Sequence, residues 1–142
     1  HVMMAGDGAE AFAKSVGIEF ANDDYFYTEQ RYKQWLDLKD STNYQLDHSA
    51  NPGNKMGTVG AVALDNFGNI AAATSTGGMT NKQFGRIGDS PVIGSGTYAN
   101  NHTCAISCTG HGELFLRSVV AYDISCLMEY KGLSLKEACN MW

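Results

Sequence analysis

Two apolar segments after residue 57 carry the clearest strand pattern in the chain. The segments "TVGAVALD" (58–65) and "NIAAATST" (69–76) are rich in small and β-branched residues, and Asn66-Phe67-Gly68 separates them. A glycine in such a turn supplies the positive φ angle that a tight hairpin needs. The pattern therefore predicts a β-hairpin. Because both faces of each strand are apolar, it also predicts a sheet that is covered on both sides.

Helical periodicity and a polar stretch precede this hairpin. Residues 7–16 predict a short helix that ends at Gly17, and Thr28 is placed to cap a second helix over "EQRYKQWLDLK". From about residue 40 to residue 56 the chain is polar, contains a Pro-Gly pair and has no lasting periodicity. This composition predicts an exposed linker, so we expect the chain to divide at the end of this linker, near residue 55.

Helices dominate the pattern after the hairpin. Residues 77–102 are glycine-rich and predict mostly irregular structure, and "TCAISC" (103–108) predicts a third strand. Residues 112–132, "GELFLRSVVAYDISCLMEYKG", have apolar side chains at helical spacing and predict one long helix that ends at its last glycine. Ser134 and Glu137 have the spacing of a capping box and predict the start of a further helix.

Composition narrows the class of protein. The 142 residues, 44% of them hydrophobic, are enough to bury a core as one ordinary domain. Ten basic and fifteen acidic side chains give a net charge of −5 without a Lys/Arg cluster, so we expect no nucleic-acid partner. The apolar stretches are far shorter than the roughly 20 residues that span a bilayer, so we expect no membrane partner.

The cysteines could in principle form disulfides or a metal site. The four are Cys104, Cys108, Cys126 and Cys139. None forms a CxxC pair, and we interpret them as reduced, small hydrophobic residues. His102 and His111 lie nearby, but their spacing is not typical of zinc ligands, so we predict no metal site. Reduced cysteines favour the cytoplasm, whereas a secreted or periplasmic location stays open because the natural N-terminus is expected upstream of His1.

Familiar catalytic motifs are missing. There is no G-x-S-x-G elbow, and the glycine pairs 94/96 and 110/112 lack the third glycine of a dinucleotide fingerprint. Hydroxyl residues beside glycines are more informative. Thr58 follows a glycine, while Thr76 and Thr109 each precede one, and all three lie at ends of predicted strands. Each threonine–glycine pair alone is explained by the preference of threonine for strands and of glycine for turns. Three such pairs at strand ends together indicate a functional site.

A charged pair follows the hairpin in the segment "GRIGDS". Arg86 and Asp89 offer a cation and a carboxylate that could hold a zwitterionic ligand. A salt bridge between two such loop residues is the commoner arrangement.

Three segments, "GTVGAVALDNFGNIAAATSTGGMTNK", "GRIGDSPVIGSGTYANN" and "SCTGHGE", resemble the plant-type asparaginase/isoaspartyl peptidase family of N-terminal nucleophile hydrolases. The resemblance is collinear from about residue 55 to residue 130, and "HVMMAGDGAEAFA" and "LDHS" are similar to the later part of that family's α subunit. It implies an α/β fold, the four-layer αββα sandwich. The sandwich would be incomplete here, because the family's amino-terminal "HGGAG" segment and its later β-subunit strands do not appear.

The resemblance also implies a division of the chain. The precursor of such an enzyme cuts itself before a threonine, here between Gly57 and Thr58. Residues 1–57 would then be the C-terminal part of the α subunit, including the linker at about 40–56, and residues 58–142 the N-terminal part of the β subunit. The mature form would be an (αβ)₂ assembly without a cofactor. A structural sodium ion is conceivable, but its ligands would lie mostly upstream of His1.

Catalytic roles follow from the same resemblance. Thr58 would be the nucleophile, Thr76 would orient its hydroxyl, and the Thr109 hydroxyl with the Gly110 N–H would form the oxyanion hole. An internal threonine has only an amide nitrogen, which cannot act as a base. Cleavage converts this amide into an α-amine with a pKa of about 7.7–8.0, so about a tenth to a fifth of it is neutral at pH 7. One residue then supplies both nucleophile and base.

Substrate binding is implied as well. Arg86 would bind the α-carboxylate and Asp89 the α-ammonium, with the Gly110 and Gly112 backbone nearby. The reaction would be hydrolysis of L-asparagine and isoaspartyl (β-aspartyl) dipeptides to release aspartate. A glycosylasparaginase-type amidase is the nearest alternative, although those enzymes typically carry aspartate where this chain has Gly57. A non-catalytic binding fragment of the same fold is the other alternative. His111 receives no catalytic role.

Overall fold

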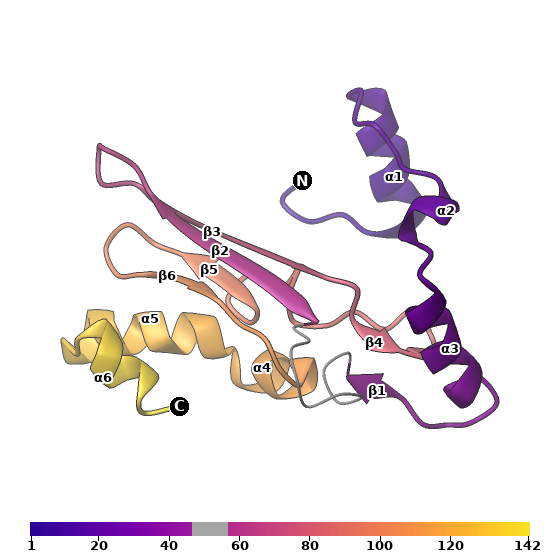
Figure 1. Cartoon of the computed structure of the whole chain (residues 1–142). Coiled ribbons are helices and arrows are strands. Elements are labelled where there is room, and N and C mark those ends of the chain that lie inside the picture. The colour runs from indigo at the N-terminus through magenta and orange to yellow at the C-terminus, as the bar shows by residue number, and fades with distance from the viewer. Residues whose placement is uncertain (47–56) are drawn as a thin grey trace. The chain divides into compact units, whose positions relative to one another are not determined.

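The computed structural model describes residues 1–46 and 57–142. The chain separates into two compact units, residues 1–34 and residues 35–142, which are described one at a time (Figure 1).

The first unit is helical. It contains α1 (Gly6–Ser15), α2 (Asp23–Phe26) and the start of α3 (Glu29–Leu38). The predicted first helix is confirmed, and the chain leaves it through Gly17, whose φ of 78° is in the region that glycine favours. The short α2 escaped prediction because one turn carries no periodicity; the Asn22 side chain caps it by accepting a hydrogen bond from the Tyr25 N–H.

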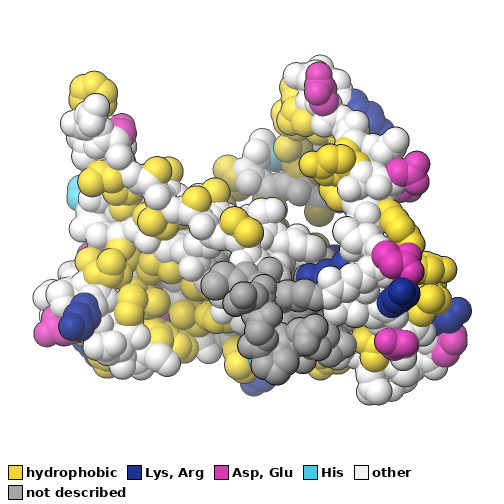
Figure 2. Space-filling view, in the orientation of Figure 1, with side chains coloured by type: hydrophobic (Ala, Val, Ile, Leu, Met, Phe, Trp, Pro, Cys, Tyr) yellow, Lys and Arg dark blue, Asp and Glu magenta, His cyan; other side chains and the backbone are white. Residues whose placement is uncertain are grey.

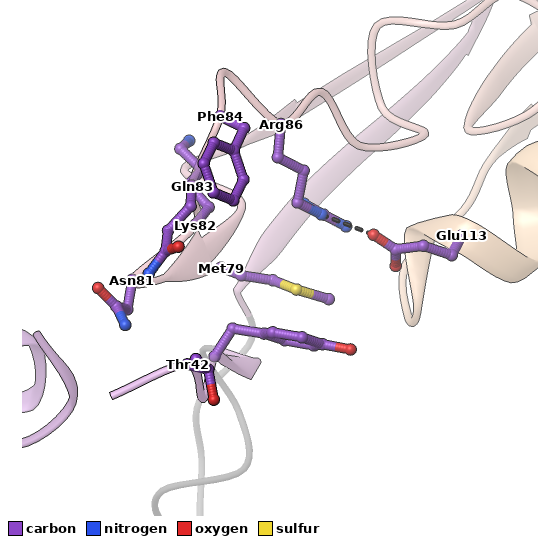
Figure 3. Close-up of a pocket in the computed structure, with 9 residues that line it drawn as sticks. Thr42, Met79, Asn81, Lys82, Gln83, Phe84, Arg86 and Glu113 are labelled. Carbon is purple, nitrogen blue, oxygen red and sulfur yellow. Dashed lines mark hydrogen bonds and ion pairs between the residues drawn. The ribbon is translucent and has the colours of Figure 1, made fainter. Parts of the chain in front are cut away.

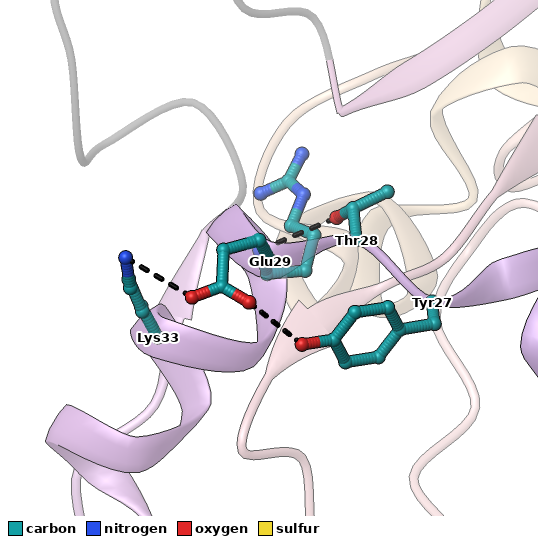
Figure 4. A network of polar contacts seen from close by, with 5 residues as sticks. Tyr27, Thr28, Glu29 and Lys33 are labelled. Carbon is teal, nitrogen blue, oxygen red and sulfur yellow. Dashed lines mark hydrogen bonds and ion pairs between the residues drawn. The ribbon is translucent and has the colours of Figure 1, made fainter.

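A polar network fixes the first turn of α3 (Figure 4). Thr28 caps the helix as predicted, since its hydroxyl oxygen accepts a hydrogen bond from the Arg31 N–H at 3.3 Å. The Glu29 carboxylate accepts a hydrogen bond from the Tyr27 hydroxyl at 2.8 Å and pairs with Lys33 at 3.1 Å. The hydrogen bond from Tyr27, more than the one from Lys33, lowers the pKa of Glu29.

The second unit is built around the predicted hairpin, which is confirmed. Strand β2 (Thr58–Leu64) pairs antiparallel with β3 (Ile70–Thr76). In the turn Gly68 has a φ of 86°, and the Asp65 carboxylate accepts hydrogen bonds from the backbone N–H groups of Phe67 and Asn69. This register places Thr58 directly opposite Thr76 at the open end of the hairpin.

A second hairpin stacks on the first. It consists of β5 (Thr97–Ala99) and β6 (Ala105–Ser107), so the predicted third strand is confirmed and its partner β5 is new. Both strands contact β3, and the Thr74 and Ser107 hydroxyls lie 2.7 Å apart between the hairpins. A Cβ added at Gly60 would overlap the Ser107 side chain, so glycine lets the layers approach here.

Gly60→Ala is therefore expected to destabilise the protein by about 1–3 kcal/mol, as overpacking typically does. Gly8→Ala in α1 is the matched control, because nothing lies within 4 Å of a Cβ at that position. Urea unfolding of the two variants beside the wild type measures the effect. Equal midpoints for Gly60→Ala and the wild type would show that the layers do not depend on this close approach.

Helices α4 (Gly112–Ser118), α5 (Val120–Lys131) and α6 (Leu135–Cys139) follow the second hairpin, and α5 contacts β5 (Figure 1). The prediction of one long helix over 112–132 was wrong, because Val119 adopts a φ of 50° and separates α4 from α5. The break directs the Tyr122 N–H to the Gly94 carbonyl at 2.8 Å, a tertiary contact that periodicity cannot reveal. Gly132 and the Ser134–Glu137 capping box end α5 and begin α6 as predicted.

The buried core lies between these helices and the second hairpin. Its members are Cys104, Val120, Ile124, Leu127 and Ala138. All four cysteines are free, with Cys104 buried and Cys139 exposed. In the described part of the chain, no helix combines the length and the apolar character needed to cross a membrane.

A short ladder joins residues from both sides of position 57. Strand β1 (Gln45–Leu46) pairs antiparallel with β4 (Met79–Thr80). The Asn81 side chain supports it by donating hydrogen bonds to the carbonyls of Leu38 and Asn43, each at 2.9 Å. Residues 40–46 of the predicted linker are thus tied to the second unit, while residues 47–56 lie outside the described residues.

Apolar side chains stay exposed on both faces of β2. Val59 lies on one face, whereas Val62 and Leu64 lie on the face that carries Gly60. They retain 68%, 59% and 72% of their accessible surface, and hydrophobic side chains follow this hairpin in the space-filling view (Figure 2). The prediction of cover on both sides is therefore not met within residues 1–46 and 57–142. An apolar strand pattern predicts the cover that a sheet requires, and the described elements leave these side chains of β2 exposed.

Candidate active site

The hydroxyl groups of Thr58 and Thr76 meet across the open end of the hairpin. Thr58 Oγ1 donates a hydrogen bond to Thr76 Oγ1 at 3.2 Å. Thr76 Oγ1 in turn donates to the Gly57 carbonyl oxygen at 3.0 Å. Since a hydroxyl has one hydrogen and two lone pairs, Thr76 can make both contacts at once. A continuous hydrogen-bonded path therefore connects the Thr58 hydroxyl with the carbonyl of the bond that precedes it.

Glycine geometry holds Thr76 in place. Gly78 has a φ of 84°, which turns the backbone at the end of β3 so that its N–H donates to Thr76 Oγ1 at 3.0 Å. Thr76 Oγ1 thus accepts two hydrogen bonds and donates one, which uses its full capacity. Gly78 therefore helps to orient the Thr76 hydroxyl.

A small cavity of about 30 Å³ lies at this point. The six predicted site residues that line it are Gly57, Thr58, Thr76, Arg86, Asp89 and Gly110. Gly78, Met79, Gly88 and Ser90 complete the lining. Such a volume holds about one water molecule. The structure therefore brings together residues up to 53 positions apart, but in a space smaller than an amino acid.

Arg86 pairs with Glu113, at the start of α4. Arg86 Nε lies 2.6 Å from Glu113 Oε1, and the arginine side chain is only 19% exposed. The hydrogen bond from Arg86 is the main cause that lowers the pKa of Glu113. The sequence interpretation missed this partner and weighed a bridge to Asp89 instead. The only sequence signal was a carboxylate in the first turn after "TGHG".

Asp89 is nearly buried, with 6% of its surface exposed. Its Oδ2 atom is buried without a hydrogen-bond partner in the structure. Desolvation raises the pKa of Asp89, and the nearby Arg86 charge lowers it by a smaller amount. A buried carboxylate oxygen without a donor is costly, so this position favours a ligand that brings an N–H donor or a positive charge.

Gly112 makes room for both charged side chains. A Cβ at this position would lie 2.7 Å from Asp89 Oδ1 and 3.1 Å from Arg86 Nη2. Gly110, on the cavity wall, has a φ of 147°, and a Cβ there would lie 2.8 Å from the Phe115 ring. Thr109 is exposed and lies on a wider neighbouring groove of about 470 Å³, which it shares with Thr58.

No group of three metal-binding side chains occurs among residues 1–46 and 57–142. His111 is exposed at the N-terminus of α4 and makes no capping hydrogen bond there.

The structure thus brings the hydroxyls of Thr58 and Thr76 onto one hydrogen-bonded path to the Gly57 carbonyl, beside Arg86 and Asp89. A family model described as asparaginase matches residues 1–142. The chain therefore belongs to the asparaginase family of N-terminal nucleophile hydrolases, and the resemblance drawn from its motifs is confirmed.

Curated relatives agree with this assignment. The chain is 58% identical to the isoaspartyl peptidases of Salmonella typhimurium and Escherichia coli, over 99% of its own length and 46% and 44% of theirs. It is 44% identical to the isoaspartyl peptidase/L-asparaginase of Xenopus laevis, over 99% of the chain and 44% of that protein. The chain thus spans a little under half the length of these relatives.

Proposed function

We propose that the protein containing this chain cuts itself between Gly57 and Thr58 and then hydrolyses L-asparagine and isoaspartyl dipeptides to release aspartate. The observation that carries the proposal is the path from the Thr58 hydroxyl through Thr76 to the Gly57 carbonyl. The names of the relatives, isoaspartyl peptidase and isoaspartyl peptidase/L-asparaginase, support the choice of substrates.

Self-cleavage would use the Thr58 hydroxyl, the Thr76 hydroxyl and the Gly57 carbonyl. Thr58 Oγ1 attacks the Gly57 carbonyl carbon, and its proton passes to the Thr58 nitrogen as the C–N bond breaks. The Thr76 hydroxyl already donates to the carbonyl oxygen, where negative charge develops during attack. Water then hydrolyses the resulting ester between Gly57 and Thr58. The products are a Gly57 carboxylate and a free Thr58 α-amine, the base that hydrolysis of the substrate requires.

Cavity size supports the order of these steps. The space beside Thr58 measures about 30 Å³ while Gly57 is still attached, which is too small for an aspartyl group. Departure of Gly57 would open this space and release Thr76 from the Gly57 carbonyl. Hydrolysis of a substrate is therefore expected only after cleavage.

Charge complementarity supports the choice of an α-amino acid. Arg86 supplies a cation for the α-carboxylate, and the partnerless Oδ2 of Asp89 is an acceptor for the α-ammonium. The β-carbonyl then faces Thr58, which forms an acyl-enzyme and expels ammonia or an amine. The Thr109 hydroxyl and the Gly110 N–H would stabilise the oxyanion, and the loss of one such donor typically costs about 2.7–4 kcal/mol. Water finally releases aspartate.

The larger assembly belongs to the same proposal. Residues 1–57 would be the end of the α subunit and residues 58–142 the start of the β subunit of a four-layer αββα sandwich, mature as (αβ)₂. The exposed apolar side chains of β2 support the presence of further covering elements in the whole protein. No cofactor and no nucleic-acid partner are expected, and a structural sodium ion would have its ligands outside this chain. The free cysteines favour the cytoplasm.

A direct comparison of substrates tests the assignment within the family. The complete protein, once cleaved, is offered β-aspartyl-leucine, L-asparagine and a glycosylated asparagine at equal concentrations. We expect release of aspartate from the first two and little from the third, because Gly57 departs from the glycosylasparaginase pattern. A clear preference for the sugar-linked amide, measured as kcat/KM, would favour the glycosylasparaginase alternative instead.

A further inference from the structure

A second cavity of about 420 Å³ adjoins the small one beside Thr58. Met79 and Arg86 line both cavities, so the two spaces share a wall. The volume is in the range of ligand pockets, about 300–1,000 Å³. In the close-up the Arg86–Glu113 pair closes one side of this pocket, and Phe84 lies across from Met79 (Figure 3).

The pocket is assembled from both sides of the proposed cleavage site. Thr42 and Tyr44 contribute from before Gly57, whereas the remaining lining residues come from after it. The Asn81 side chain holds the segment 38–43 in place through the carbonyls of Leu38 and Asn43. This fixed wall makes the pocket a built feature, not a gap beside a loose segment.

Lys82 gives the pocket its charge. Its ammonium donates to the Gly77 carbonyl at 2.7 Å, and a Cβ at Gly78 would lie 3.1 Å from it. The cation therefore lies beside the strand end that carries Thr76. An ammonium has three donors, so the Gly77 bond leaves capacity for an anion. In the described part of the chain no carboxylate pairs with Lys82, whereas Arg86 is paired with Glu113 and is the proposed partner of the α-carboxylate of the aspartyl group.

The lining also has an apolar part, formed by Tyr44, Met79 and Phe84. Phe84 is fully exposed and Tyr44 is 65% exposed, beside the buried Met79. Phe84 also has a φ of 56°, an unfavourable conformation for a bulky residue that is commonest at functional sites. A ligand with an apolar body and one carboxylate would cover these side chains and meet Lys82.

We infer that this pocket binds the leaving residue of an isoaspartyl peptide, with its free carboxylate on Lys82 and its apolar side chain against Met79 and Phe84. The inference rests on the proposed function. It follows that a C-terminal carboxylate and an apolar side chain in the leaving residue favour hydrolysis. L-Asparagine, whose leaving group is ammonia, leaves the pocket empty.

The test compares three substrates: β-aspartyl-leucine, β-aspartyl-leucinamide and L-asparagine. In the wild type, kcat/KM for the free acid should exceed that for the amide about tenfold, which corresponds to about 1.4 kcal/mol, the scale of one charge-assisted hydrogen bond. Lys82→Met in the complete, cleaved protein should remove this preference. Lys82→Met should also lower the ratio of kcat/KM for β-aspartyl-leucine to kcat/KM for asparagine about tenfold. Lys82→Arg, which keeps a cation, should retain part of both preferences. Lys136→Met, on the exposed surface of α6, is the matched control and should change neither ratio.

Three outcomes would overturn the inference. Equal wild-type kcat/KM for β-aspartyl-leucine and its amide would show that no cation binds the free carboxylate. This comparison uses only the wild type, so it does not depend on the folding of a variant. A parallel loss on all three substrates in Lys82→Met would place the lysine at the shared aspartyl group. A wild-type protein that hydrolyses none of the three would instead refute the proposed function itself.

Discussion

Thr58→Ala is expected to leave the chain uncut and to abolish hydrolysis of asparagine. The substitution removes the hydroxyl that attacks the Gly57 carbonyl, and without cleavage no α-amine forms at residue 58. Removal of the nucleophile of a hydrolase can cost on the order of 10⁶-fold in kcat. Intact mass spectrometry of the complete protein and an ammonia-release assay measure the two effects.

Two companion variants separate chemistry from folding. Thr58→Ser keeps both the hydroxyl and the nitrogen, so it should still cleave and turn over asparagine, at reduced rates. Ser75→Ala removes an exposed hydroxyl next to Thr76 and should behave like the wild type. Normal asparagine turnover by Thr58→Ala would refute Thr58 as the nucleophile.

Asp89→Asn is expected to lower kcat/KM for asparagine by about 10²-fold or more while the folded protein becomes no less stable. Truncating one partner of a buried charge pair typically costs about 2–5 kcal/mol in binding. In the free protein, however, Asp89 is a desolvated carboxylate with an unpartnered Oδ2, so its neutral isostere should be tolerated. This split between activity and stability distinguishes a ligand-binding aspartate from a structural one. Asp37→Asn, an exposed position in α3, is the control.

The pKa of Asp89 also gives a signed pH dependence. Because burial raises this pKa, the protonated form is favoured in the folded protein, and any stability it contributes is lost as pH rises through the folded value. Binding of the product aspartate requires the ionised form. Its affinity should therefore fall, on acidification, at a pH above the ordinary aspartate value of about 3.9. Calorimetric titration across pH should show this fall in the wild type, and an unchanged profile in Asp89→Asn would contradict the assignment.

Local signals in the sequence predicted much of the fold. The hairpin 58–76 was predictable because two runs of small and β-branched residues flank a glycine turn, and the capping residues Thr28 and Ser134 act over three positions. The same hairpin predicts the meeting of Thr58 and Thr76, since strand register follows from the turn.

Features that depend on distant partners were not predictable. The break at Val119 accompanies a hydrogen bond from Tyr122 to Gly94, 28 residues earlier. The two-residue strands β1 and β4 form only through each other, across the proposed cleavage site. The Arg86–Glu113 pair spans 27 residues, which include the whole β5–β6 hairpin. In each case a long-range contact overrides or creates local structure without leaving a periodic pattern.

The state of the bond between Gly57 and Thr58 tests the central claim most directly. Purified complete protein is incubated and its intact mass is followed with time. We expect two chains whose masses sum to the precursor plus one water, the second beginning with Thr58. Hydrolysis of asparagine should appear in step with cleavage. A single uncut chain with no amino-terminal Thr58 after prolonged incubation would contradict self-activation and leave a non-catalytic binding fragment of the same fold as the better account.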